Sequence, residues 1–107
     1  MVDSLDALEQ LKWSVQALAA DAETQQRLFP VYACTMDELV LDFDNWFKAT
    51  RWRDDLAISS DQSQALESID RLIESMSREA FADGALKTHH DWQTLRAAAA
   101  KALRAFA

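Results

Sequence analysis

Acidic side chains are concentrated in residues 37–45, a segment with a helical pattern. Asp37, Glu38, Asp42 and Asp44 precede Asn45 there. At about 100° per residue, Glu38 and Asp42 are neighbours one turn apart, whereas Asp37 and Asp44 lie on another edge of the helix. Carboxylates at this density can bind a divalent cation or attract a basic protein. Because one metal ion cannot contact all four, we expect these residues and Asn45 to form a protein-binding face.

A second acidic run, Glu67, Asp70 and Glu74, also has spacings of three and four residues. Two facing helices could supply four ligands for Mg²⁺ or Mn²⁺, namely Glu38, Asp42, Glu67 and Asp70. The spacing Glu67-x-x-Asp70 resembles one half of the paired acidic motifs of the all-α nucleotide pyrophosphatases, which implies a metal-dependent hydrolase of a nucleotide or phosphate ester. The other half of that motif is not matched. Because these carboxylates lie opposite the apolar positions of their helices, we expect them to face solvent, and we expect no metal and no cofactor.

The other reactive residues lack a recognisable motif. His89 and His90 are adjacent, so on a helix their side chains point about 100° apart and cannot share a metal ion without ligands from elsewhere. We expect both to be exposed in the first turn of the last helix. Cys34 is the one cysteine and has no flanking motif, and a single glycine excludes a glycine-rich phosphate loop. The sequence therefore favours binding over catalysis.

Several apolar residues interrupt the polar pattern of the predicted helices. Leu41 lies about 160° from the apolar stripe of its helix, among the acids, and should be exposed. Trp13 lies about 150° from the stripe of the first helix and is either exposed or covered by residues 21–34. Arg51 and Trp52 belong to the residue types enriched at binding hot spots, although Trp52 can equally cover the end of the core. We therefore add Trp13, Leu41, Arg51 and Trp52 to the predicted binding surface.

The helices that would position these residues are marked by apolar side chains spaced three and four apart. The pattern predicts helices over residues 5–20, 35–50, 60–83 and 89–106, with a further turn after Asp21 and an extended connection at 30–34. Ser59 or Ser60 and Thr88 are candidate N-caps, and Gly84 a candidate left-handed residue at a helix end. We expect an all-α fold: an antiparallel bundle of about four amphipathic helices in one domain over residues 1–107.

The 107 residues carry a net charge of -7. Nine acidic and three basic residues fall within residues 1–50, so this half holds most of the excess negative charge. Such a charge disfavours nucleic acid as a partner. No apolar run reaches the roughly 20 residues of a membrane span, and the acidic start of the chain does not resemble a signal peptide. We expect a cytoplasmic protein.

These observations favour a non-enzymatic interaction module whose acidic face binds a basic protein. In size and composition the chain is similar to the small acidic helical immunity proteins of bacteria, which implies a stoichiometric inhibitor that neutralises a basic toxin. The metal-dependent hydrolase is the alternative hypothesis. A homodimer formed through Trp13 or the alanine run at residues 97–100 is a further hypothesis.

Overall fold

The computed structural model describes residues 4–29, 34–51 and 58–106, and all regular elements in these ranges are helical. Four helices are long: α1 (Ser4–Ala19), α3 (Thr35–Arg51), α4 (Ser60–Ser75) and α6 (His90–Ala105). Three are short: α2 (Ala22–Arg27), the 3-10 turn η1 (Arg78–Phe81) and α5 (Ala85–Thr88). The predicted all-α fold is confirmed.

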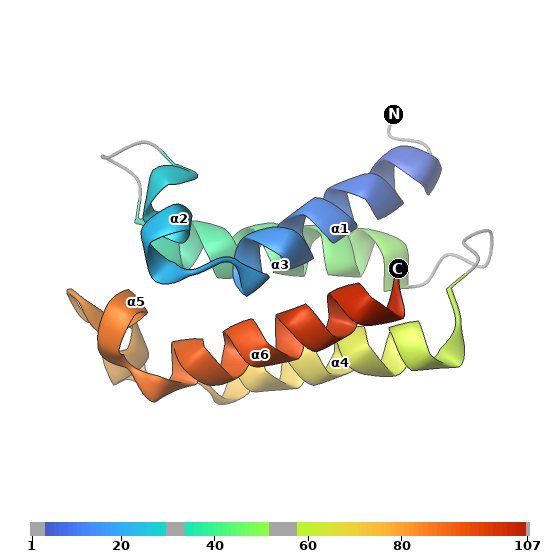
Figure 1. The fold of residues 1–107 in the computed structure, drawn as a ribbon. Helices are drawn as coiled ribbons and strands as arrows, with labels where there is room; N and C mark the ends of the chain where they lie inside the picture. The colour runs from blue at the N-terminus through green and yellow to red at the C-terminus, as the bar shows by residue number, and fades with distance from the viewer. Residues whose placement is uncertain (1–3, 30–33, 52–57, 107) are drawn as a thin grey trace.

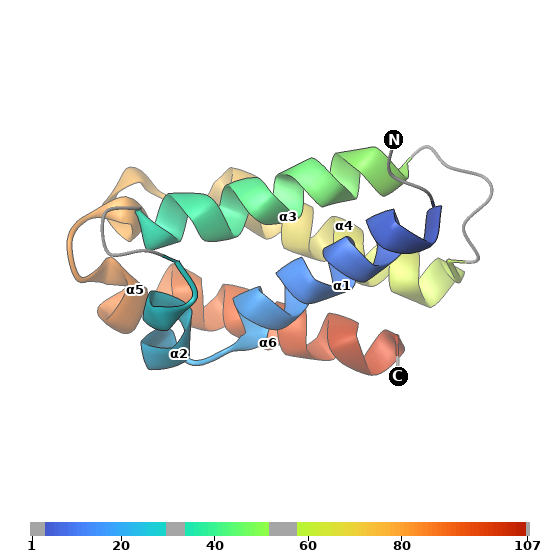
Figure 2. The same cartoon turned by 90° about the horizontal axis from the view of Figure 1, so that it is seen from above.

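The long helices run alternately in opposite directions and form two layers (Figure 1). α1 and α3 pack together in one layer, α4 and α6 pack together in the other, and α1 also packs on α6. Figure 2 shows α1 and α3 side by side, in front of α4 and α6. The arrangement is the antiparallel bundle that the four apolar stripes predict. The side of α3 that faces away from the core therefore belongs to the outer surface of the upper layer.

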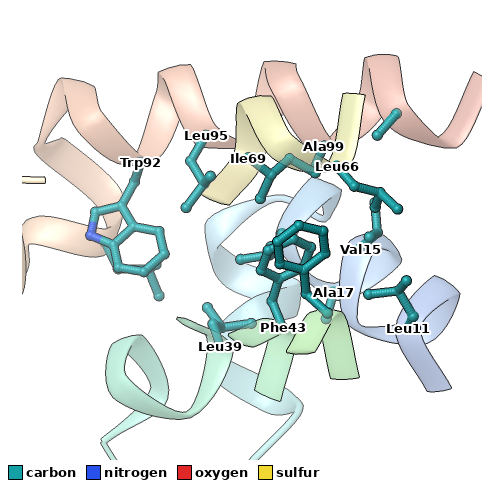
Figure 3. Close-up of a cluster of buried hydrophobic side chains, with 14 residues drawn as sticks. Leu11, Val15, Ala17, Leu39, Phe43, Leu66, Ile69, Trp92, Leu95 and Ala99 are labelled. Atoms are coloured by element: carbon teal, nitrogen blue, oxygen red, sulfur yellow. The ribbon is translucent and has the colours of Figure 1, made fainter. Parts of the chain in front are cut away.

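The core is filled by the apolar stripe of each long helix (Figure 3). Each long helix contributes fully buried side chains to the core, for example Leu11 from α1, Phe43 from α3, Ile69 from α4 and Trp92 from α6. The ring of Phe43 stacks on that of Phe47 one turn later, with centroids 5.4 Å apart. Burying one side chain of this size contributes about 1.5–3 kcal/mol, so these stripes fix which face of each helix points outward.

Side-chain caps begin α2 and α4 where the sequence suggests. The Asp21 carboxylate accepts the backbone N–H of Thr24 at 2.8 Å, and this hydrogen bond holds the pKa of Asp21 below its usual value. Ser59 caps α4 in a capping box: its hydroxyl accepts the Gln62 N–H, and the Gln62 side chain accepts the Ser59 N–H. Each cap satisfies a backbone donor that the first helical turn leaves unpaired.

The segment between the third and fourth long helices differs from the prediction. α4 ends at Ser75, not near residue 83, because Met76 adopts an extended conformation and η1 and α5 follow. Gly84 is left-handed, with φ of 80°, but it precedes α5 and does not end a long helix. The N-cap of α6 is His89, whose Nδ1 accepts the Asp91 N–H at 3.1 Å, whereas the predicted cap Thr88 is the last residue of α5. Residues 76–83 continue the helical periodicity in sequence, but in the structure they turn to pack against α6. The hydrogen bond from the buried Trp92 indole to the Ala80 carbonyl is one of these contacts.

No helix in the described ranges combines the length and the apolar character that a membrane crossing requires.

Candidate protein-binding face

The orientation of α3 follows from its apolar repeat. Leu39, Phe43 and Phe47 recur every four residues and are buried against the other helices. Side chains about half a turn away from this stripe must therefore point outward. We call the outward set the α3 face, defined as Asp37, Glu38, Leu41, Asp42, Asp44 and Asn45.

Leu41 is the most exposed large apolar side chain in the described part of the protein. Its exposed fraction is 59%, which confirms the sequence prediction. On a helix its surface neighbours are the residues three and four positions away, and these are Asp37, Glu38, Asp44 and Asn45. Leu41 is thus surrounded by three of the four carboxylates of the α3 face and by one amide.

The carboxylates of the α3 face have different environments. Asp37 and Glu38 are exposed in the first turn of α3, where the helix dipole favours negative charge. Asp44 instead accepts a hydrogen bond from the Lys48 ammonium at 2.9 Å, and this bond raises the pKa of Lys48 above its usual value. Lys48 therefore partly neutralises Asp44, whereas Asp37 and Glu38 have no ion pair among the described residues.

Asp42 is half-buried at the edge of the α3 face. Burial raises the pKa of the Asp42 carboxyl, the charge of Glu38 raises it further, and a hydrogen bond from the Trp46 side chain opposes both effects. Its Oδ2 atom is buried and has no hydrogen-bond partner among the described residues. An acceptor in this state weakens the fold, because its lost hydration is not replaced by an internal hydrogen bond.

Trp13 lies on the neighbouring helix and is 42% exposed. It lines a hollow of about 150 Å³ between α1 and α2, together with Gln16, Ala17, Ala20, Thr24 and Leu28. Both sequence interpretations of Trp13 are therefore partly correct, since residues of the 21–34 segment contact the same hollow while much of the indole faces solvent. Leu28, 36% exposed, joins Trp13 there. Sequence reasoning missed Leu28, because only the turn between α1 and α2 brings it beside Trp13.

Two predicted members of the surface are not placed. Arg51 is the last residue of α3, and its side chain lies outside what the structure describes. Trp52 lies outside the described residues altogether. The candidate site therefore consists of the α3 face and the hollow at Trp13 and Leu28.

The four carboxylates of the hydrolase hypothesis are not brought together as metal ligands. Within the described ranges, the sole group of three or more ligand-bearing side chains with atoms inside 4.8 Å of one another is His89, His90 and Asp91. Glu38, Asp42, Glu67 and Asp70 form no such group. The expectation that both histidines would be exposed in a helical turn is wrong for His89, which is extended and half-buried.

Comparison with protein-family models, with curated proteins and with solved structures finds no match.

Proposed function

We propose that this chain is a non-enzymatic interaction module that binds a basic protein through the α3 face. The observation that carries the proposal is Leu41, an apolar side chain held outward by a rigid helix and surrounded by carboxylates. Covering the exposed part of a leucine contributes about 1–2 kcal/mol to association. The surrounding negative charge would speed the approach of a basic surface and disfavour acidic competitors.

A single helix face is too small for a stable complex, since a standard interface covers about 800 Å² on each partner. The hollow at Trp13 and Leu28 supplies a second apolar contact on the neighbouring helix pair. Tryptophan is among the residues most enriched at binding hot spots. We infer that the partner spans from α3 over α1, whose side-by-side positions are visible in Figure 2.

The sharpest form of the proposal is a cytoplasmic stoichiometric inhibitor. An acidic module of this size could cover the cationic surface with which a nuclease-type toxin binds its nucleic acid, as an immunity protein does. The support for it is the clustering of negative charge in residues 1–50 together with the two exposed apolar contacts. The module would then act by steric and electrostatic occlusion, without chemistry of its own.

Charge reversal on the α3 face tests the proposal. Asp37→Lys combined with Glu38→Lys should abolish recovery of basic partners from native lysate, and should raise the Kd of a purified partner at least about tenfold. The matched control is Asp61→Lys with Glu67→Lys on α4, because both residues are exposed and Asp61 likewise lies in the first turn of its helix. This control changes the net charge equally and should leave binding unchanged.

Two results would contradict the proposal. Equal partner recovery by both charge-reversed variants would show that the position of the charge is irrelevant. A dimer in sedimentation at micromolar concentration that Leu41→Asp or Trp13→Ala converts to a monomer would assign the exposed apolar residues to a second copy of the chain.

A further inference from the structure

Three side chains with metal-ligating atoms meet at the start of α6, away from the α3 face. They are His89, His90 and Asp91, and each offers a nitrogen or carboxylate oxygen within 4.8 Å of the others. The backbone conformation of His89 brings these three side chains close together. Two adjacent histidines within a helix would point about 100° apart, but His89 is the extended N-cap residue, with φ of -78° and ψ of 132°. This break in the helix lets consecutive residues share one small volume.

The distances between these groups suit a small coordination sphere. His90 Nδ1 lies 3.4 Å from Asp91 Oδ1, and His89 Nδ1 lies 3.7 Å from Asp91 Oδ2. Two ligands of a tetrahedral ion with bonds of about 2.0–2.1 Å are separated by about 3.3 Å. The three ligand atoms, which lie within 4.8 Å of one another, must therefore come closer by side-chain rotation to surround one ion.

Ser77 orients the carboxylate from outside this group. Its backbone N–H donates to Asp91 Oδ2 at 3.1 Å, and its hydroxyl lies 3.4 Å from the same oxygen. The Ser77 hydroxyl also lies 3.4 Å from His89 Nε2. Such outer hydrogen bonds hold ligating side chains in place in metalloproteins. Here they engage Asp91 Oδ2, so that Oδ1 is the oxygen that faces His90.

We propose that His89, His90 and Asp91 bind a divalent transition-metal ion of the Zn²⁺ class. Two imidazoles and one carboxylate match the ligand preference of such ions, whereas Mg²⁺ and Ca²⁺ prefer oxygen ligands alone. Three protein ligands leave a fourth position open. His90 and Asp91 also line a hollow of about 230 Å³ with Leu72, Ser75, Met76 and Thr94, which has room for a water molecule as that fourth ligand.

His89 also caps α6 through a hydrogen bond that metal binding at the same nitrogen must displace. Its Nδ1 accepts the Asp91 N–H and so caps α6, which in the neutral ring places the proton on Nε2. A metal ion at Nδ1 would replace that hydrogen bond, because one lone pair cannot serve both. The Asp91 amide resonance should therefore shift on metal addition, together with both imidazoles.

The test is a titration of the full chain with Zn²⁺ alone, in competition with a chromophoric chelator, and with Co²⁺ alone to record the coordination geometry. The background carries Cys34→Ser, because its exposed thiol could bind Zn²⁺ as a thiolate and obscure binding at the histidines. His90→Gln removes a ligand whose side chain is 79% exposed, so folding should be unaffected. His89→Asn removes the imidazole but keeps an N-cap residue of the preferred type. Glu79→Gln, an exposed acid in η1, is the matched control.

We expect one equivalent of Zn²⁺ to bind, each histidine variant to weaken binding at least about tenfold, and Glu79→Gln to bind as the parent does. A tetrahedral Co²⁺ spectrum and coincident shifts of both imidazoles and the Asp91 amide would accompany this binding. Absence of one-to-one binding in the Cys34→Ser background, or binding that survives either histidine variant, would overturn the proposal. Its failure would leave the α3 face unaffected, because the two sites share no residue.

Discussion

Two regions of the bundle differ in whether their buried polar atoms have hydrogen-bond partners. At the end of the bundle where α2 and α5 meet α6, buried polar atoms are paired internally. The fully buried Gln25 donates from Nε2 to the carbonyls of Ala17 and Leu18, both at 3.0 Å, and its Oε1 accepts from Arg96 at 2.9 and 3.1 Å. Arg96 donates in turn to the Leu86 carbonyl. On the α3 face, by contrast, Leu41 is exposed and Asp42 Oδ2 has no hydrogen-bond partner among the described residues.

The difference separates residues that hold the fold from residues available for other purposes. Gln25 and Arg96 join α1, α2, α5 and α6, and removing either would leave buried partners without their hydrogen bonds. The exposed side chains of the α3 face contribute little to the bundle, and Asp42 weakens it. Substitutions in the two regions should therefore affect different properties, stability in the first and binding in the second.

The largest expected loss of stability is for Gln25→Ala. The change removes four hydrogen bonds and leaves the end of α1 and the Arg96 guanidinium without their partner. We expect the free energy of unfolding to fall by about 3 kcal/mol in chemical denaturation, with partner affinity of the folded fraction unchanged. A loss below about 0.5 kcal/mol would mean that this network does not hold the end of the bundle.

A smaller loss is expected for Trp92→Phe in the same region. The indole N–H of the buried Trp92 donates to the Ala80 carbonyl at 2.7 Å, and its ring packs edge-on against Phe81 with centroids 5.8 Å apart. Phenylalanine keeps the aromatic character but loses the donor and some volume. Unfolding should become easier by about 2 kcal/mol, as measured by thermal or urea denaturation. No change in the unfolding midpoint would show that η1 does not depend on this hydrogen bond.

Asp42→Asn should increase the free energy of unfolding, whereas the two preceding substitutions lower it. Because the folded state raises the pKa of Asp42, the folded chain binds more protons than the unfolded chain between the two pKa values, and stability falls as pH rises through that window. At pH 7 the asparagine variant should therefore be more stable, by less than about 1 kcal/mol because the group is partly exposed. The gain should vanish below pH 3.8, the ordinary value for the aspartate.

Denaturation curves at several pH values check this prediction, with Asp37→Asn as the matched loss of one charge on the same helix. A gain for Asp42→Asn that is independent of pH would contradict the assigned cause.

The sequence predicts those features that depend on the periodicity of a single helix. The positions of α1 and α3, the exposure of Leu41 and the partial exposure of Trp13 all follow from spacings within one segment. Features that depend on contacts between distant segments are not predictable in this way. Gln25 is buried only because α1 and α6 enclose it, and Leu28 lies beside Trp13 only through the turn before α2. The break after Ser75 depends on the packing of η1 and α5 against α6, and the extended residue between α5 and α6 is what leaves His89 as the cap.

Leu41→Asp tests the central claim most directly, because it should abolish partner binding and leave the stability of the fold unchanged. The side chain is exposed, so the free energy of unfolding of the variant, measured in urea, should stay within about 0.5 kcal/mol of that of the parent. Recovery of the basic partner should be lost, and the Kd of the purified partner should rise at least about thirtyfold, because the central apolar contact is lost and the new carboxylate must be desolvated beside three others. Full partner binding by a stably folded Leu41→Asp variant would contradict the assignment of the α3 face as the binding surface.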